Sequence, residues 1–123
     1  MMIEVACGVM YNSENKILMG KRPNQKYYAG YWEFPGGQLE QNETIEECLI
    51  REWEEELNLK INIEKEIYAY HYDNKYFCRF FKGTILDEEN MKINEHEEIK
   101  FLLKDDVYNL KLFEGDTHVL DKL

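Results

Sequence analysis

Cysteine is scarce in this sequence, which has only Cys7, Cys48 and Cys78 among its 123 residues. The number is odd and the spacing matches no zinc-binding pattern, so neither a disulfide framework nor a structural zinc site is indicated. Such cysteines are typical of reduced thiols in a reducing compartment.

Long apolar runs are also missing. No stretch approaches the ~20 apolar residues that a membrane span requires. The first twelve residues, MMIEVACGVMYN, lack the basic start and the apolar length of a signal peptide. We therefore expect a cytoplasmic protein that does not insert into a membrane.

Positive charge is in short supply. The chain has 15 lysine and arginine residues against 25 aspartate and glutamate residues, which gives a formal net charge of −10. Long nucleic acid is bound by basic surfaces, so it is excluded as a partner. A small nucleotide is not excluded, because a divalent cation can lie between protein carboxylates and phosphates.

The residues that are present suffice for one folded domain. Hydrophobic residues make up 44% of the chain and aromatic residues 14%, and the length predicts a single domain over residues 1–123. No repeat, low-complexity tract or linker interrupts it. We expect strands over residues 3–12, 16–22, 31–34, 60–72, 75–86 and 99–103, and helices over 45–57, 104–110 and 115–123. This order predicts an α/β fold with helices on the faces of a mixed sheet.

Two short segments are expected to reverse the chain. Pro35, Gly36 and Gly37 follow the third expected strand and predict a turn ahead of the first helix. Asp73 and Asn74 separate two β-rich runs and predict a hairpin.

The first helix carries an unusual concentration of negative charge. Residues 40–56 contain eight glutamates and one arginine. Thr44 and Glu47 form a capping-box pattern, so the helix should begin at Ile45. Asn58 can adopt the left-handed conformation that ends a helix.

At the helical period, some of these glutamates fall on the apolar face. That face is formed by Ile45, Cys48, Leu49, Trp53 and Leu57. Glu52 and Glu56 lie within it and Glu55 lies at its edge, whereas Glu54 points away. A glutamate-rich helix is ordinarily a solvated face, but solvated glutamates should lie opposite the apolar residues.

Grouping Glu52, Glu55 and Glu56 is costly unless a cation accompanies them. Two like charges ~4 Å apart repel by about 4 kcal/mol near a protein surface, and Glu52–Glu55 and Glu52–Glu56 are i,i+3 and i,i+4 neighbours on one helix face. Hard carboxylate oxygens on one face suit Mg²⁺ or Mn²⁺. The pattern therefore favours a divalent metal site over a solvated face.

The same residues resemble the Nudix box, G-x5-E-x7-R-E-U-x-E-E-x-G-U, in which U is apolar. The matching residues are Gly37, Glu43, Arg51, Glu52, Trp53, Glu55, Glu56 and Leu59. Asn58 stands where the pattern has its last glycine. Outside the box, the segments WEFPGG, KRP and EHEEIKFL are similar to MutT-type members of the Nudix hydrolase family.

The resemblance implies an α/β/α sandwich around a mixed β-sheet. It also implies Mg²⁺-dependent hydrolysis, with Mn²⁺ as an alternative cofactor, of a nucleoside diphosphate linked to another group. In MutT-type members a nucleoside triphosphate is cut to a monophosphate and pyrophosphate. We therefore expect a small nucleotide as the partner of a monomer or homodimer.

The resemblance also assigns roles to residues. The implied metal ligands are Gly37, through its carbonyl, Glu52, Glu55 and Glu56, and the implied catalytic residues are Glu52, Glu55 and Glu98. Glu43 and Arg51 correspond to an ion pair that joins loop and helix. Glu52 is the leading general base, with a ligand-only role as the alternative. Glu97, next to Glu98, is an alternative for the downstream carboxylate.

Three residues correspond to positions that bind substrate in relatives. Arg22 is expected to contact a phosphate, Phe34 to stack on a base, and Asp116 to read the base. The alternatives are a surface arginine, a core phenylalanine and an aspartate that caps the last helix. Gln38 stands where many MutT-type sequences have lysine, so one phosphate contact is expected to be absent.

The remaining polar residues have simpler expectations. Arg79 is expected in a structural ion pair, and Cys48 in the core. His71, His96 and His118 show no ligand spacing and are expected at the surface.

The expected function is removal of modified nucleoside triphosphates such as 8-oxo-dGTP. The alternatives are a hydrolase of cytidine-type triphosphates, ADP-ribose or a sugar nucleotide, and a non-catalytic Nudix module that senses a nucleotide. The last alternative would expect loss of the box glutamates, and all of them are present.

Overall fold

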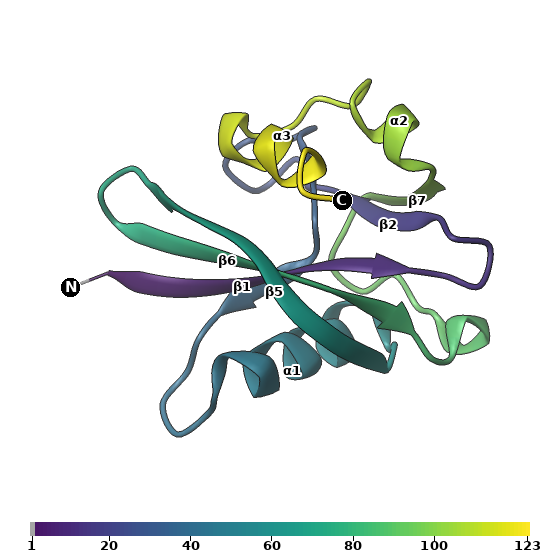
Figure 1. The fold of residues 1–123 in the computed structure, drawn as a ribbon, viewed down its shortest axis with the longest axis horizontal. Coiled ribbons are helices and arrows are strands. Elements are labelled where there is room, and N and C mark those ends of the chain that lie inside the picture. The colour runs from purple at the N-terminus through teal and green to yellow at the C-terminus, as the bar shows by residue number, and fades with distance from the viewer. Residues whose placement is uncertain (1) are drawn as a thin grey trace.

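The computed structural model describes residues 2–123 as a mixed β-sheet with helices on both faces (Figure 1). The strands are β1 (Ile3–Tyr11), β2 (Ile17–Lys21), β3 (Trp32–Glu33), β4 (Gly36–Gln38), β5 (Ile61–Tyr72), β6 (Tyr76–Ile85) and β7 (Glu98–Leu102). The helices are α1 (Ile45–Leu57), α2 (Lys104–Val107) and α3 (Glu114–Leu120), with a 3₁₀ turn, η1, at Glu88–Asn90. The α/β class and the α/β/α layering expected from the sequence are confirmed.

The strands follow the order β3-β2-β1-β6-β5, with β4 paired to β1 and β7 paired to β2. Strands β1 and β6 run parallel, and the other strand pairs are antiparallel. The predicted hairpin joins β5 to β6, and Asp73 and Asn74 adopt φ values of 55° and 50°. This is the left-handed conformation that short hairpin turns require.

The expected turn at residues 35–37 is wrong, because Gly36 and Gly37 belong to strand β4. Gly36 pairs with Cys7 of β1, and a Cβ at Gly36 would lie 1.8 Å from the carbonyl oxygen of Ala6. Gly36 therefore allows strands β1 and β4 to approach each other closely and does not reverse the chain.

Helix α1 begins and ends as its sequence predicts. The Glu47 amide donates to Thr44 Oγ1 at 3.1 Å, and the Thr44 amide donates to Glu47 Oε1 at 2.8 Å. Asn58 has φ 54° and ends the helix in the left-handed conformation. No helix within residues 2–123 is long and apolar enough to cross a membrane.

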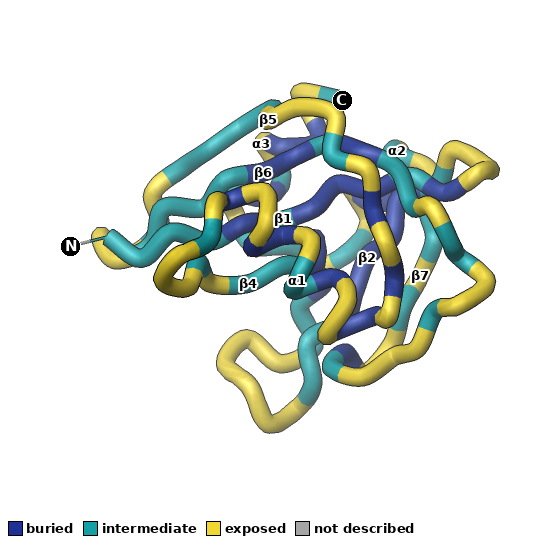
Figure 2. Tube along the Cα trace, turned by 90° about the horizontal axis from the view of Figure 1, so that it is seen from below, coloured by how far each residue is buried: buried dark blue, intermediate teal, exposed yellow. Residues whose placement is uncertain are grey.

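The sheet separates two hydrophobic cores, whose buried segments run along the central strands in Figure 2. The core under α1 contains Leu18, Cys48, Leu49, Trp53, Leu57 and Phe81. The core on the other face contains Met19, Trp32, Phe34, Phe80, Val107, Val119 and Leu120. Each core holds one of the two tryptophans, and Cys48 is buried as expected.

Candidate active site

One cavity of about 780 Å³ collects most of the predicted site residues. Its lining comes from β1, β3, β4, α1, the β5–β6 hairpin, α3 and the loops after β2 and ahead of β7. One group of lining residues is acidic and consists of Glu52, Glu55 and Glu56. A second group is largely apolar and consists of Cys7, Phe34, Tyr70, Cys78, Phe80 and Asp116. The cavity therefore offers an apolar region for an aromatic part of a ligand and, beside it, an acidic region for a charged part that carries a cation.

Glu52 lies directly against the backbone of β4. A Cβ at Gly37 would come within 2.3 Å of the Glu52 carboxylate carbon and 2.5 Å of its oxygens. The carboxylate and the backbone of Gly37 can therefore share one ligand only because residue 37 has no side chain.

Glu56 is an acidic side chain inside the protein. It is 7% exposed, and its Oε2 has no hydrogen-bond partner in the described chain. Burial, followed by the neighbouring carboxylates of Glu52 and Glu33, raises the pKa of Glu56 to about 9. An uncompensated carboxyl group is expensive to bury. Gly37, Glu52 and Glu56 thus form a set of oxygen donors that fits a hard divalent cation, whose charge would favour the ionised form of Glu56.

Glu55 and Glu98 lie farther from this set. The Glu55 side chain is 60% exposed and accepts from Arg51 Nη1 at 3.3 Å. Glu98 is exposed at the start of β7, beside Lys21, and is not among the lining residues; neither is Glu97. The structure therefore brings Glu55 to the rim of the cavity and leaves Glu98 outside it, so the role of Glu98 stays a prediction.

Arg51 connects the acidic helix to the preceding loop. Its Nε and Nη2 donate to the two carboxylate oxygens of Glu43 at 3.0 and 2.8 Å, and its Nη1 donates to Glu52 Oε1 at 2.9 Å. These hydrogen bonds lower the pKa of Glu43 to about 2. The same guanidinium donates to the carbonyl of Gln38 at 3.2 Å. Arg51 therefore holds the loop, β4 and Glu52 in one arrangement.

Asp116 and Tyr70 form the polar part of the apolar group. The Tyr70 hydroxyl donates to Asp116 Oδ1 at 2.7 Å, and the Tyr70 ring stacks on Phe80 at 5.6 Å. Burial, opposed by the Tyr70 bond and aided by the charge of Glu33, raises the pKa of Asp116 to about 7. The alternative of a capping aspartate is wrong, because the N-cap of α3 is Phe113.

Phe34 and Arg22 also reach the cavity. Phe34 is 2% exposed and meets Phe80 edge-on at 5.9 Å, so it forms part of the wall. Arg22 Nη1 donates to Glu33 Oε1 at 2.8 Å, and Arg22 Nε donates to the carbonyl of Tyr27 at 2.8 Å. Arg22 is therefore held in the cavity wall rather than free at the surface.

His96 is not the surface residue that the sequence predicted. It is 6% exposed, and its Nε2 lies 2.8 Å from Glu33 Oε2 and 3.8 Å from Glu56 Oε1. Burial, the largest effect, raises the pKa of Glu33, but hydrogen bonds from His96 and Arg22 bring it below its usual value. Glu33, Glu56 and His96 are close enough to hold a metal ion together.

The NUDIX domain family model matches residues 1–123, the whole chain. The protein belongs to the Nudix family. The 8-oxo-dGTP diphosphatase of Proteus vulgaris is 41% identical over 59 residues, covering 48% of this chain and 53% of that protein. The CTP pyrophosphohydrolase of Escherichia coli K12 is 40% identical over 62 residues, covering 50% and 45%. This chain spans about half the length of these relatives.

A solved Nudix structure agrees with the fold over its full length. The MutT NUDIX hydrolase from Burkholderia pseudomallei superposes with a TM-score of 0.85 and 20% identity, covering 100% of this chain and 98% of that one. At that identity the likeness supports the fold alone.

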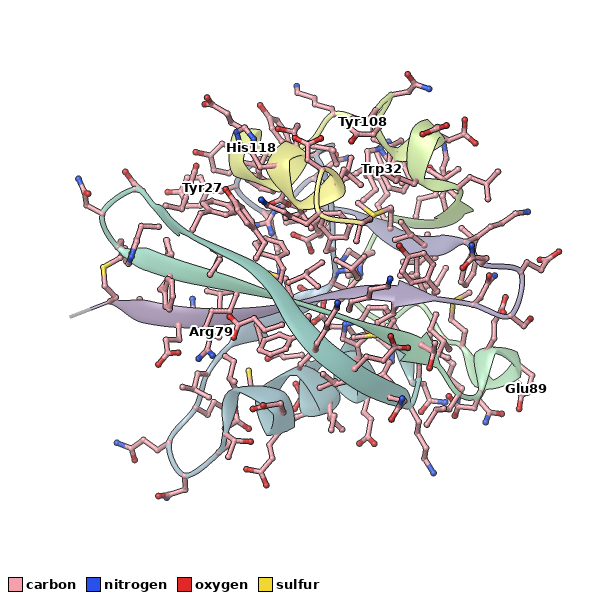
Figure 3. All side chains as sticks on the ribbon, viewed as in Figure 1. Tyr27, Trp32, Arg79, Glu89, Tyr108 and His118 are labelled. Atoms are coloured by element: carbon pink, nitrogen blue, oxygen red, sulfur yellow. The ribbon has the colours of Figure 1, made fainter. Side chains whose placement is uncertain are left out.

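Outside the cavity, this Nudix domain has polar residues with structural roles. Arg79, labelled in Figure 3, pairs with Glu4 at 3.0 Å and Glu66 at 2.8 Å and does not line the cavity. The expected structural ion pair is therefore present. His118 is exposed, as expected, and so is His71, which stacks on Phe77.

Glu33 and His96 were missed as site residues. The pattern of the Nudix box draws attention to residues 37–59, and neither residue lies within it. Their contact depends on β7 and β3 both pairing with β2. One signal in the sequence concerns Glu33. Side chains alternate along a strand, so the side chain of Glu33 must lie on the opposite face of the sheet from the buried Trp32.

Proposed function

We propose that this Nudix protein is a divalent-cation-dependent pyrophosphohydrolase that cleaves a nucleoside triphosphate such as 8-oxo-dGTP to the monophosphate and pyrophosphate. The observation that carries the proposal is the single cavity of about 780 Å³ that contains both an acidic cluster and a buried Asp116–Tyr70 pair. The volume suits a nucleotide-sized ligand. A relative that shares 41% identity over half of this chain is named 8-oxo-dGTP diphosphatase.

The residues that would hold Mg²⁺, or Mn²⁺, are Glu52, Glu56 and the carbonyl of Gly37, with Glu55 at the rim. Two observations support this assignment: Glu56 Oε2 has no hydrogen-bond partner among residues 2–123, and Gly37 lies close to Glu52. When bound, such a cation neutralises phosphate charge and favours attack of water on phosphorus.

Glu52 is proposed as the base that takes a proton from the attacking water. Arg51 Nη1 donates to Glu52 Oε1 at 2.9 Å, which orients the carboxylate. As the water oxygen bonds to phosphorus, the phosphoanhydride bond to the leaving group breaks and pyrophosphate departs. Glu98, at the first position of β7 and outside the cavity lining, stays a candidate for a further base.

Asp116 is proposed to recognise the base. In its ionised form it accepts hydrogen bonds, so it favours bases that present N–H groups. The N1–H and amino groups of 8-oxoguanine qualify, and Phe34 and Phe80 supply an apolar wall beside them. Arg22, which also lines the cavity, would contact the phosphates.

A cytidine triphosphate is the second candidate, and the Tyr70 contact favours it. Asp116 Oδ1 already accepts from Tyr70, so Oδ2 is the readily available acceptor. The single amino group of cytosine needs one acceptor, whereas the two guanine donors suit a carboxylate with both oxygens available. A relative with 40% identity over half of this chain is named CTP pyrophosphohydrolase.

A substrate panel tests the proposal. The protein is incubated with Mg²⁺ and 8-oxo-dGTP, dGTP, dCTP, CTP, dTTP or ADP-ribose, and pyrophosphate and phosphate release are scored separately. We expect pyrophosphate from 8-oxo-dGTP or from cytidine nucleotides, with dTTP poor. Turnover of ADP-ribose alone would replace the triphosphate assignment, and binding without turnover of any compound would favour a nucleotide-sensing module.

A further inference from the structure

The imidazole of His96 reaches across a strand to a partner on the next one. Strand β2 lies between β7 and β3, and its Gly20 pairs with Ile99 on one side and with Glu33 on the other. A Cβ at Gly20 would lie 2.4 Å from His96 Cδ2. The missing side chain at residue 20 therefore provides the space through which His96, just ahead of β7, contacts Glu33.

The two carboxylate oxygens of Glu33 accept hydrogen bonds from two different residues. His96 Nε2 lies 2.8 Å from Oε2, and Arg22 Nη1 lies 2.8 Å from Oε1. His96 Nδ1 is buried and has no partner among residues 2–123. A buried N–H without an acceptor is rarer than an unpaired acceptor, so the hydrogen-bond network assigns the imidazole proton to Nε2. His96 is thus a donor to Glu33.

This arrangement fixes the guanidinium of Arg22. Its Nη1 is held by Glu33 and its Nε by the carbonyl of Tyr27, while its Cζ lies 5.9 Å from the centroid of the Phe113 ring. Within the described chain, Nη2 makes no hydrogen bond, and Arg22 lines the cavity. A planar guanidinium with donors still available is well suited to a phosphate oxygen.

We propose that His96 and Glu33 are positioning residues that orient Arg22 for a phosphate of the substrate, which rests on the proposed triphosphate function. His96 acts through Glu33 and not as a metal ligand. Its Nε2, the ring nitrogen nearest to both carboxylates, donates its proton to Glu33 and so has no lone pair to offer a metal between Glu33 and Glu56. The 3.8 Å separation of His96 Nε2 from Glu56 is longer than its 2.8 Å contact with Glu33.

The test compares four variants with the wild type. His96→Leu removes the donor while keeping an apolar bulk, and His96→Gln places an amide N–H near the position of Nε2. Gly20→Ala displaces the imidazole without changing it. His118→Leu is the matched control, because His118 is exposed in helix α3 and does not line the cavity.

Four quantities are measured for each variant. They are kcat and KM for the best triphosphate, the Kd for inorganic tripolyphosphate with Mg²⁺, and the Mn²⁺ affinity without nucleotide by electron paramagnetic resonance. We expect His96→Leu and Gly20→Ala to raise KM and the tripolyphosphate Kd about tenfold with a smaller change in kcat. His96→Gln should recover most of the loss, and His118→Leu should match the wild type.

A double-mutant cycle with Arg22→Ala tests whether His96 affects phosphate binding through Arg22. If His96 acts through Arg22, adding His96→Leu to Arg22→Ala should weaken tripolyphosphate binding no further. Additive losses would overturn the inference. Weaker Mn²⁺ binding by the His96→Leu single variant would also overturn it, because His96 would then be a metal ligand. A lower melting temperature with unchanged KM and Kd would overturn it as well, because His96 would then be a packing residue.

Failure of the inference and failure of the proposed function give different results. Tripolyphosphate binding needs no turnover. A wild type that binds tripolyphosphate but cleaves no triphosphate overturns the function, and the variants still decide the role of His96 by binding. A wild type that cleaves triphosphates while His96→Leu binds and cleaves equally well overturns the inference alone.

Discussion

The Tyr70 hydroxyl donates a hydrogen bond of 2.7 Å to Asp116 Oδ1 and so joins strand β5 to helix α3 in the cavity wall. Tyr70→Phe removes the donor and leaves a buried carboxylate less well satisfied. We expect the free energy of unfolding to fall by about 1–3 kcal/mol and the preference among triphosphates to weaken. Chemical denaturation and kcat/KM on the substrate panel measure the two effects. An unchanged ranking of bases would show that Tyr70 supports the fold without shaping recognition.

Asp116 should also make stability depend on pH. Its pKa is raised from 3.8 to about 7, chiefly by burial, so the native state binds a proton that the unfolded state has released. The stability that this proton contributes is fully present below the unfolded pKa and is lost as the pH rises through about 7. Asp116→Asn removes the titration. The unfolding free energy of the variant relative to the wild type should therefore increase from pH 5 to pH 8 in urea titrations.

Asp116→Ala separates base recognition from stability. The loss of the carboxylate should flatten the ranking of triphosphates while Mg²⁺ still raises the melting temperature, because Asp116 is not among the proposed metal ligands. We would abandon Asp116 as the reader of the base if kcat/KM fell equally for every triphosphate.

The acidic cluster should respond to divalent ions before any substrate is added. Millimolar Mg²⁺ or Mn²⁺ should raise the melting temperature, because a ligand that binds only the native state stabilises it. Glu56→Gln should remove most of that shift and most of the activity while the protein stays folded. Glu54→Gln is the matched control, since Glu54 is exposed on the same helix. Equal losses in the two variants would contradict the assignment of Glu56.

Arg51 should not tolerate replacement by lysine. Its guanidinium contacts both oxygens of Glu43, Oε1 of Glu52 and the carbonyl of Gln38, and an ammonium cannot reproduce this planar set of donors. Arg51→Lys should lower both the melting temperature and kcat, the latter because Glu52 is no longer oriented. A variant with normal kcat would show that Glu52 is held by other contacts.

Trp53 connects the core under α1 to Pro35, the residue directly ahead of the strand that carries Gly37. Its indole N–H donates to the Pro35 carbonyl at 2.9 Å, and its ring is fully buried. Trp53→Phe should cost about 1–3 kcal/mol by loss of the buried hydrogen bond, with a further loss from the cavity left behind. Thermal unfolding measures the cost. Metal affinity should fall as well if the bond helps to place β4 beside Glu52.

Local sequence determined helix α1 well, since capping residues, helical period and apolar face are short-range properties. The burial of Glu56 followed from its place on that face. The errors concern contacts between distant segments. The run at residues 35–37 has the composition of a turn, yet pairing with β1 makes it a strand. His96 has no neighbouring ligand pattern, and its burial depends on the strands that surround Gly20.

The placement of one tryptophan in each core provides two optical reporters on opposite sides of the same sheet. Trp32 lies in the core beside α2 and α3, and Trp53 lies in the core beneath α1. Fluorescence from Trp32→Phe therefore reports on the face that carries the acidic helix, and fluorescence from Trp53→Phe reports on the face next to the C-terminal helix. Within each variant, a fluorescence curve that coincides with the far-UV circular dichroism curve would mean that both faces unfold as one cooperative unit. A Trp32 fluorescence curve that precedes the circular dichroism curve of the same variant would mean that the base-recognition side can loosen while the metal-binding side stays folded.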